Sequence, residues 1–384
     1  MSESCWYLLS KGIQKLFVLL IVIAAAGGLL VWLTKHRAVT ELPQTRPQQA
    51  LTKPGPPQAA TDSLVERLSA CARDLTSAGD AAVRHQKLQS LRDSLASGST
   101  NDISVAIRRF LDSKTDSSTG LGFKPGAKGS LKEAPTLRTY LLDYLGQIDR
   151  LAAAAYAKTI LASSDSPDEW AIALRDLAMA DASPESRKLL EDKTRELLRR
   201  EDWQQNPSSG YLEAFDTAVY LGGTNLMPDL ATLVRKKDNR AVAFAAYLTL
   251  DRLVTADPPA TLGAMQADPD LLQGREITRA DFFARADLRD PQQRRVIENY
   301  LLDSRIAAPE LQQFAGIFPN GGHMVSENLL TPMPTPQPGD LAAHDAACLK
   351  VVNEWLADPR FEKIRPELNK LKTRLEEFTR QAAR

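Results

Sequence analysis

The chain has 384 residues, enough for two or three domains or one extended helical array, and its 48 Lys and Arg residues balance 48 Asp and Glu residues. That balance argues against a nucleic-acid binder, because such proteins gather cations on one surface. Aromatic residues are only 6% of the chain, and Ala, Leu, Arg, Glu and Asp dominate. The composition therefore favours an all-α fold.

An uncharged apolar segment lies near the start of the chain, at residues 16–34 (LFVLLIVIAAAGGLLVWLT). As a helix it would measure about 28 Å, close to the hydrocarbon thickness of about 30 Å. We therefore expect a transmembrane helix after a short N-terminal tail at residues 1–15. A cleaved signal peptide is the alternative, but its apolar core is usually only about 7–15 residues long.

Basic residues flank this segment on both sides: Lys11, Lys15, Lys35, Arg37, Arg46 and Lys53. Counting them by the positive-inside rule points against an external domain, whereas a short basic tail before a long apolar run is typical of an N-in signal anchor. We expect a single-pass protein of a bacterial inner membrane with its C-terminal domain periplasmic or exterior. The lipid bilayer is then a partner through residues 16–34.

A Pro- and Gln-rich linker is expected at residues 35–61, because five prolines and few apolar residues favour an extended spacer. Helical periodicity begins at Asp62, a candidate N-cap, and predicts an N-terminal helical segment over residues 62–134. Within it, residues 113–129 (SKTDSSTGLGFKPGAKG) are predicted to form a mobile loop. Their glycine spacing departs from the phosphate-binding pattern GxxxxGK[ST].

Residues 135–318 show one helical pattern after another, beginning with a long helix predicted over 136–162. Prolines occur where later helices start, at first-turn positions that need no N–H donor: Pro167, Pro184, Pro228, Pro258, Pro291 and Pro309. The helix starts suggest pairs that repeat every 30–45 residues or so, a period typical of helical solenoids.

One stretch shows this pattern most clearly, residues 226–254 (LMPDLATLVRKKDNRAVAFAAYLTLDRLV). It comprises a first helix, a turn at residues 238–240, and an Ala-rich second helix. Four small residues of the second helix would permit close packing: Ala241, Ala243, Ala245 and Ala246. The stretch resembles a HEAT-type repeat, and the resemblance implies an alpha-solenoid over at most residues 135–318. An irregular helical bundle is the alternative.

The C-terminal part begins with a Gly- and Pro-rich stretch at residues 319–339. We expect it to form an ordered loop, because its apolar residues need cover: Met324, Val325, Leu329 and Leu330. A C-terminal helical hairpin is predicted over residues 340–384, with helices at 341–357 and about 361–382. The second helix carries a narrow apolar stripe, which fits either docking on the body or presentation to a partner: Ile364, Leu368, Leu371, Leu375 and Phe378.

Reactive groups are sparse. Of the four histidines, His36, His85 and His344 lie in helical or membrane-flanking patterns, and only His323 lies in a plausible site. Cys5, Cys71 and Cys348 lack metal-binding spacing, although a Cys71–Cys348 bridge is conceivable. No GxSxG or HExxH motif occurs. We therefore predict no enzyme, no catalytic or metal site and no cofactor.

The run Arg235–Lys236–Lys237 is interpreted as cations favoured at a helix C-terminus, with phosphate contact as the alternative.

These patterns favour a membrane-anchored helical scaffold or adaptor that mediates protein–protein interaction, because helical arrays expose extended surfaces. The contact surface is expected on helices at 207–254 and on the C-terminal hairpin. A rival is an enzyme or small-ligand binder with its site under the 318–339 loop, lined by Asn320, His323, Ser326 and Glu327. A third possibility is binding of a cell-envelope polymer in grooves lined by Trp170, Trp203 or Trp355.

Overall fold

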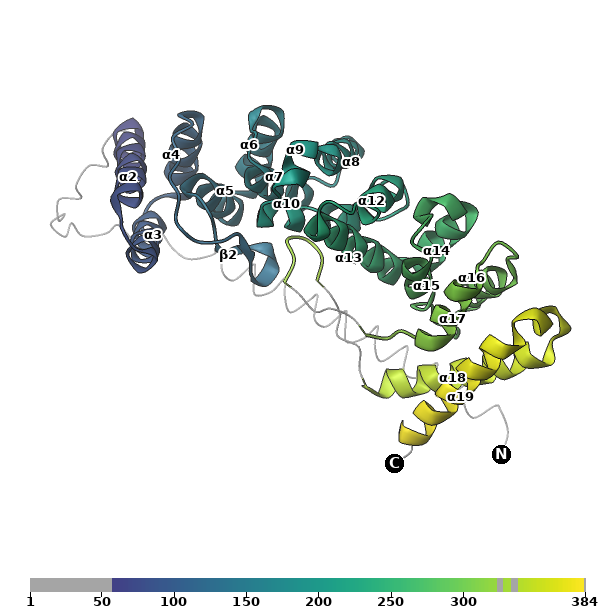
Figure 1. Cartoon of the computed structure of the whole chain (residues 1–384). Helices are drawn as coiled ribbons and strands as arrows, with labels where there is room; N and C mark the ends of the chain where they lie inside the picture. The colour runs from purple at the N-terminus through teal and green to yellow at the C-terminus, as the bar shows by residue number, and fades with distance from the viewer. Residues whose placement is uncertain (1–56, 323–326, 333–337, 383–384) are drawn as a thin grey trace, which may run out of the picture. The chain divides into compact units, whose positions relative to one another are not determined.

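The computed structural model describes residues 57–322, 327–332 and 338–382, and nearly all regular structure in these ranges is helical (Figure 1). The all-α fold class is confirmed. The expected transmembrane helix, the tail and most of the linker lie outside the described residues. Among the helices that are described, none combines the length and apolar character needed to cross a membrane.

The N-terminal elements are α2 (Pro57–Ser77), α3 (Ala81–Ala96), α4 (Thr100–Asp112), β1 (Lys124–Pro125), the 3₁₀ turn η1 (Ala127–Gly129) and β2 (Leu131–Glu133). Helix α2 starts before Asp62, so the prediction of an N-cap there is wrong. The Asp62 carboxylate instead pairs with the Arg109 guanidinium of α4 at 2.7 Å. Helix α2 packs on both α3 and α4.

The predicted mobile loop at 113–129 is held at several points. Strand β1 pairs antiparallel with β2, and Phe123, which directly precedes β1, is buried. The Ser117 hydroxyl donates to the carbonyl of Ala72 at 2.7 Å, and the Thr119 backbone N–H donates to the carbonyl of Pro135 at 3.0 Å. The Gly- and Ser-rich composition suggested freedom, but buried hydrogen bonds fix the path of this segment.

The predicted long helix at 136–162 is two helices, α5 (Leu137–Ile148) and α6 (Arg150–Ser163). Asp149 separates them, with non-helical backbone angles and a carboxylate that accepts from the backbone N–H of Ala152 at 3.0 Å. The break changes which face of α6 is buried. Leu151, an apolar residue in the first turn of α6, is consequently 78% exposed.

The following elements are α7 (Pro167–Ala180), α8 (Pro184–Arg199), α9 (Glu201–Gln205), α10 (Ser209–Glu213), α11 (Asp216–Leu221), α12 (Met227–Val234), α13 (Arg240–Ala256), α14 (Pro258–Ala267), η2 (Pro269–Leu272), α15 (Glu276–Phe283), α16 (Pro291–Leu302) and α17 (Ala308–Ile317). The six prolines lie in the first turns of their helices, as predicted. The main packing contacts join helices that are near each other in this order, such as α6 with α7 and α12 with α13.

The C-terminal elements are α18 (Pro338–Ala357), η3 (Pro359–Ile364) and α19 (Arg365–Ala382), and α18 packs along α19. On α19 the predicted stripe faces the body: Leu368, Leu371 and Leu375 are almost fully buried, and α19 contacts α17. This face is occupied by the chain itself. The polar face of α19 is the one left for solvent.

Buried ion pairs connect alternate helices, such as α5 with α7 and α15 with α17, at a regular interval. Their guanidinium and carboxylate groups come from residues 31 to 36 positions apart: Arg138–Glu169, Asp143–Arg175, Asp216–Arg252, Asp251–Arg285 and Arg279–Glu310. The pair Arg279–Glu310 is bidentate, at 2.8 and 2.7 Å, and the Tyr300 hydroxyl donates to the same carboxylate at 2.9 Å. Bidentate geometry with an added donor is what makes such burial tolerable.

The same ion pairs also hold the non-helical segments. Arg175 donates to the carbonyl of Gly129 at 2.8 Å. Asp216 accepts from the backbone N–H groups of Leu330 and Thr331 at 2.6 and 3.0 Å. Leu329 is buried, so this part of the expected ordered loop at 319–339 is covered, as predicted. Met324 and Val325 lie outside the described residues.

Candidate interaction site on helices α12, α13 and α15

The site forms where α12 ends and α13 begins. Arg235 terminates α12, which places Lys236 and Lys237 in the turn beyond it. Asn239 caps α13 by accepting from the backbone N–H groups of Ala241 and Val242 at 3.1 and 3.2 Å. The Asn239 amide also donates to the carbonyl of Gln204 at 2.8 Å, which ties the turn to α9. The predicted helix–turn–helix of residues 226–254 is confirmed.

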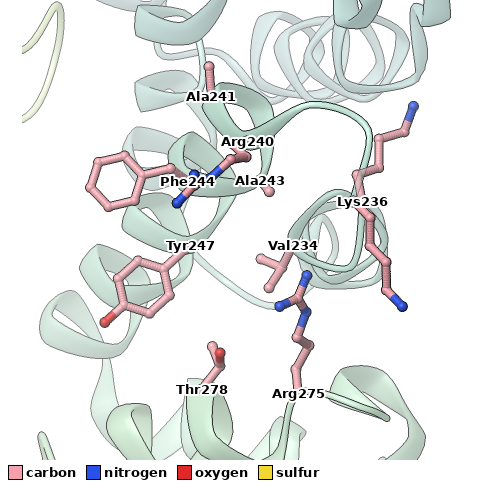
Figure 2. Close-up of a pocket in the computed structure, with 10 residues that line it drawn as sticks. Val234, Lys236, Arg240, Ala241, Ala243, Phe244, Tyr247, Arg275 and Thr278 are labelled. Atoms are coloured by element: carbon pink, nitrogen blue, oxygen red, sulfur yellow. The ribbon is translucent and has the colours of Figure 1, made fainter.

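A surface pocket of about 730 Å³ opens between this turn and α15 (Figure 2). The described residues lining it are Val234, Lys236, Lys237, Arg240, Ala241, Ala243, Phe244, Tyr247, Arg275 and Thr278. We call it the cationic pocket. Of the four alanines expected to allow close packing, Ala246 is fully buried, but Ala241 and Ala243 line this pocket. Their small side chains leave open space instead of admitting a neighbouring helix.

The charges in the cationic pocket are not neutralised. Lys236, Lys237, Arg240 and Arg275 each lack an ion-pair partner among the described residues, and no Asp or Glu lines the pocket. Figure 2 shows that they reach it from separate places, Lys236 from the turn, Arg240 from α13 and Arg275 from the start of α15. Because like charges held together repel, this arrangement favours an anionic partner.

An exposed aromatic side chain adjoins these cations. Phe244 is 52% exposed, and its ring stacks on Tyr247 with centroids 6.3 Å apart. Tyr247 stacks in turn on Phe282, which is fully buried, with centroids 5.3 Å apart. The Phe244 ring is therefore held by stacking contacts although its outer face is open. Rigid, exposed aromatic groups are common at the centres of protein interfaces.

A second pocket of about 290 Å³ shares Ala241 and Phe244 with the first. It also contains Glu213, the last residue of α10. Burial, reinforced by the Asp216 carboxylate and opposed by the Arg252 guanidinium, raises the pKa of Glu213 to about 7. The two pockets thus share Phe244 as part of their walls, one with unpaired cations and one with the Glu213 carboxyl group.

A third pocket of about 550 Å³ adjoins the segment expected to cover an active site. Asn320 lines it together with Asp281, His344 and Arg374, and its described lining includes no Ser, Thr or Cys side chain that could act as a nucleophile. Glu327 pairs with Lys132 at 2.6 Å. His323 and Ser326 lie outside the described residues.

The other residues singled out in the sequence have structural positions. Trp170, Trp203 and Trp355 are all buried, so they line no open groove for a polymer. Cys71 and Cys348 are free thiols, so the conceivable bridge between them is not formed. Within the described ranges there is no group of three or more His, Cys, Asp or Glu residues arranged to hold a metal ion.

Sequence patterns missed Phe244, Arg275 and Glu213 as site residues. Phe244 lies among small apolar residues in an Ala-rich helix, where nothing in the local pattern marks it as exposed. One signal was present: Arg275 follows Arg240 by 35 positions, within the interval at which the buried ion pairs connect helices. Residues one such interval apart are expected to lie side by side on neighbouring helices.

A comparison of the chain with protein-family models finds no match, and a comparison with curated proteins finds no similar sequence.

Proposed function

We propose that this protein is a membrane-anchored helical scaffold or adaptor, and that its cationic pocket binds an acidic segment of a partner protein. The observation that carries the proposal is that four unpaired cations and an exposed aromatic ring line the same pocket. This surface falls on the helices where the sequence favours a contact surface, extended by Arg275 from α15.

The energetics require both charge and apolar contact. An exposed ion pair contributes about 0.2–1 kcal/mol, so cations alone would hold a partner weakly and lose it in salt. Burying the open face of Phe244 adds on the order of 1 kcal/mol or more. A segment with several carboxylates and one apolar side chain satisfies both features, and it matches the pocket in charge.

The scaffold part of the proposal draws on the helical order. Ion pairs at intervals of 31 to 36 residues are expected when similar helix pairs stack one on the next. We infer a helical-repeat array of the HEAT-like kind, in which each pair buries its apolar face against its neighbours. Such arrays present extended surfaces to other proteins.

The anchor part draws on the sequence alone. Residues 16–34 carry no charge and are long enough to span a bilayer as a helix. Residues 35–56 would then hold the helical unit off the membrane surface. In this proposal the unit faces the periplasm or exterior of a bacterial inner membrane.

The direct test uses full-length protein and a fluorescent peptide of six glutamates and one leucine as the probe. We expect binding that weakens steeply with salt and falls at least tenfold in the Lys237→Glu, Arg240→Glu double variant. The matched control reverses two exposed cations that also lack ion pairs within the described part of the chain, Lys188→Glu with Arg295→Glu, and should bind like the wild type. Equal loss in both variants would show only nonspecific attraction and would overturn the proposal.

The cellular test places a photo-crosslinking amino acid at position 244 in the full chain. We expect a crosslinked protein that disappears with Lys237→Glu, Arg240→Glu and persists with the control variant. Anionic vesicles containing phosphatidylglycerol serve as a competing probe. If they bind through the same cations more tightly than the acidic peptide, the partner is a lipid surface and the proposal is wrong.

A small-ligand function remains the second candidate, favoured by the third pocket. Asp281, His344 and Arg374 contribute both charge signs to its wall, and Asn320 lines it from the loop. Thermal-shift screening with small amino and carboxylic acids tests it. We expect a ligand of this pocket to lose its shift in Arg374→Ala and to keep it in Arg240→Ala.

A further inference from the structure

The pocket around Glu213 combines an apolar wall with several charged residues, of which only Glu213 has no partner among the described residues. Leu212, Phe215, Phe244 and Leu248 supply most of its apolar wall. They come from α10 and α13 and from the short connection between α10 and α11. A volume of about 290 Å³ is large enough for one long side chain and too small for a folded element.

The charges around this pocket are neutralised except for one. Asp216 pairs with Arg252 at 2.6 Å, and Asp251 receives two hydrogen bonds from Arg285 at 2.8 and 3.0 Å. Glu213 has neither a hydrogen bond nor an ion pair with any described residue. When ionised, it therefore leaves one uncompensated negative charge in a largely apolar wall, which is costly unless a cation arrives.

We propose that this pocket binds the ammonium group of a lysine side chain, with the aliphatic stem against Phe244 and Leu248 and the ammonium on Glu213. The occupant is a lysine of the partner segment, so this part of the inference rests on the proposed function. Lysine fits because it carries a compact charge at the end of a flexible apolar stem. If Glu213 accepted two hydrogen bonds from a guanidinium, three of its five N–H donors would still need acceptors in a largely apolar pocket, whereas an ammonium has only three donors in all.

The position of Phe244 defines the order of the partner's residues. Since Phe244 lines both pockets, a segment that lies along its ring can contact the cationic pocket and the Glu213 pocket at the same time. The partner segment therefore carries an acidic stretch and a nearby lysine. A cation placed at the cationic pocket, or a carboxylate placed at the Glu213 pocket, would be repelled. The two pockets would therefore select the orientation of the partner segment as well as hold it.

Ammonium binding should also depend on pH. Glu213 faces Asp216 from α11 and Asp251 and Arg252 from α13, and its pKa lies at about 7. Below that pH the carboxyl group is protonated and offers the ammonium no charge. Affinity should consequently fall as pH drops below about 7, by up to tenfold for each pH unit.

The experiment titrates full-length protein with N-acetyl-lysine methylamide by ligand-observed NMR at pH 8 and needs no partner protein. We expect saturable millimolar binding to the wild type, at least tenfold weaker binding to Glu213→Gln, and no binding of the ε-acetylated analogue, which lacks the charge. Glu185→Gln changes an exposed glutamate that has no ion-pair partner among the residues that the structure describes, and it should bind like the wild type.

Three results would overturn the inference: unchanged binding by Glu213→Gln, equal binding of the acetylated analogue, or tighter binding of N-acetyl-arginine methylamide. If Glu213→Gln does not fold, the wild type alone decides, because binding that does not weaken from pH 8 to pH 5.5 contradicts a role for this carboxyl group. Failure here leaves the acidic-peptide result untouched, so the two proposals can fail separately.

Discussion

Two groups of arginines in this protein have opposite surroundings. Arg138, Arg175 and Arg279 are buried and paired with carboxylates that lie about one helix pair away along the chain. Arg240 and Arg275 are also separated by about one helix pair, yet they meet each other across open space. At the buried positions, the residue one such interval away from the arginine is a carboxylate that pairs with it. At the cationic pocket, the residue one interval away from Arg240 is a second cation, Arg275.

This difference separates residues that hold the fold together from residues available for binding. Removing one partner from a buried pair leaves an uncompensated charge in a poorly solvated place. Removing a cation from the open pocket relieves repulsion and changes few contacts. Variants in the two groups should therefore differ sharply in their effect on stability, and the following expectations run from the largest effect to the smallest.

Glu310→Gln should lower the free energy of unfolding by about 3–5 kcal/mol, because Arg279 then stays buried without a counter-charge. Urea unfolding followed by circular dichroism measures the change. The double variant Arg279→Met, Glu310→Met removes both charges and should recover most of the loss. A loss below about 1 kcal/mol in Glu310→Gln would show that the buried pairs do not hold successive helices together.

Gly129→Ala should cost about 2 kcal/mol or more. Gly129 has a φ of +75°, and an added Cβ would meet the backbone carbonyl of Leu329. Arg175 holds the Gly129 carbonyl from the other side, so the segment cannot easily move away. The control is Gly79→Ala, where no atom lies within 4 Å of the added Cβ. Thermal unfolding of the two variants should differ clearly, and equal midpoints would contradict the packing of residues 327–332 on this turn.

Glu213→Gln should remove a pH dependence of stability. The folded-state pKa of Glu213, about 7, lies above its ordinary value of 4.5, so the folded protein holds this proton more tightly than the unfolded chain. The stabilisation of the folded state by this tighter proton binding is complete below pH 4.5 and is lost as pH rises through 7. The variant should therefore be more stable than the wild type by about 1–2 kcal/mol at pH 8 and similar to it at pH 4.5. Urea unfolding at both values tests this, and an equal difference at both would be inconsistent with it.

Lys237→Glu with Arg240→Glu should leave the unfolding free energy within about 0.5 kcal/mol of the wild type, because both side chains are exposed and unpaired among the described residues. The same denaturation assay provides the comparison with Glu310→Gln. A loss above about 1 kcal/mol would mean that these cations stabilise the fold, and the distinction between the two groups of arginines would fail.

Much of the helical order could be predicted from sequence. Prolines at first-turn positions and the Asn239 cap depend on local backbone chemistry, which a short window of residues contains. The turn between α12 and α13 was located correctly for the same reason. The break at Asp149 was missed, because a run of helix-forming residues continues across it and the carboxylate that caps α6 acts only once α5 has ended.

The candidate site was less accessible to sequence reasoning. The run at Arg235, Lys236 and Lys237 is typical of a helix C-terminus, which is where it lies. The local pattern does not indicate that Arg275 lies beside this run, because that contact depends on how α12, α13 and α15 stack. Phe244 and Leu151 illustrate the same point, because both side chains are large and apolar, as core residues usually are, and yet both are exposed.

Sequence by itself determined the all-α class, the positions of most helix starts and the sparseness of reactive groups, because these depend on composition and on neighbours within a few residues. Only the tertiary structure decided which charges are paired, which apolar rings stay open, and that the segments around Gly129 and Leu329 touch. The buried ion pairs that join one helix to another are formed by residues 31 or more positions apart. Local patterns do not carry that information until the helices are packed.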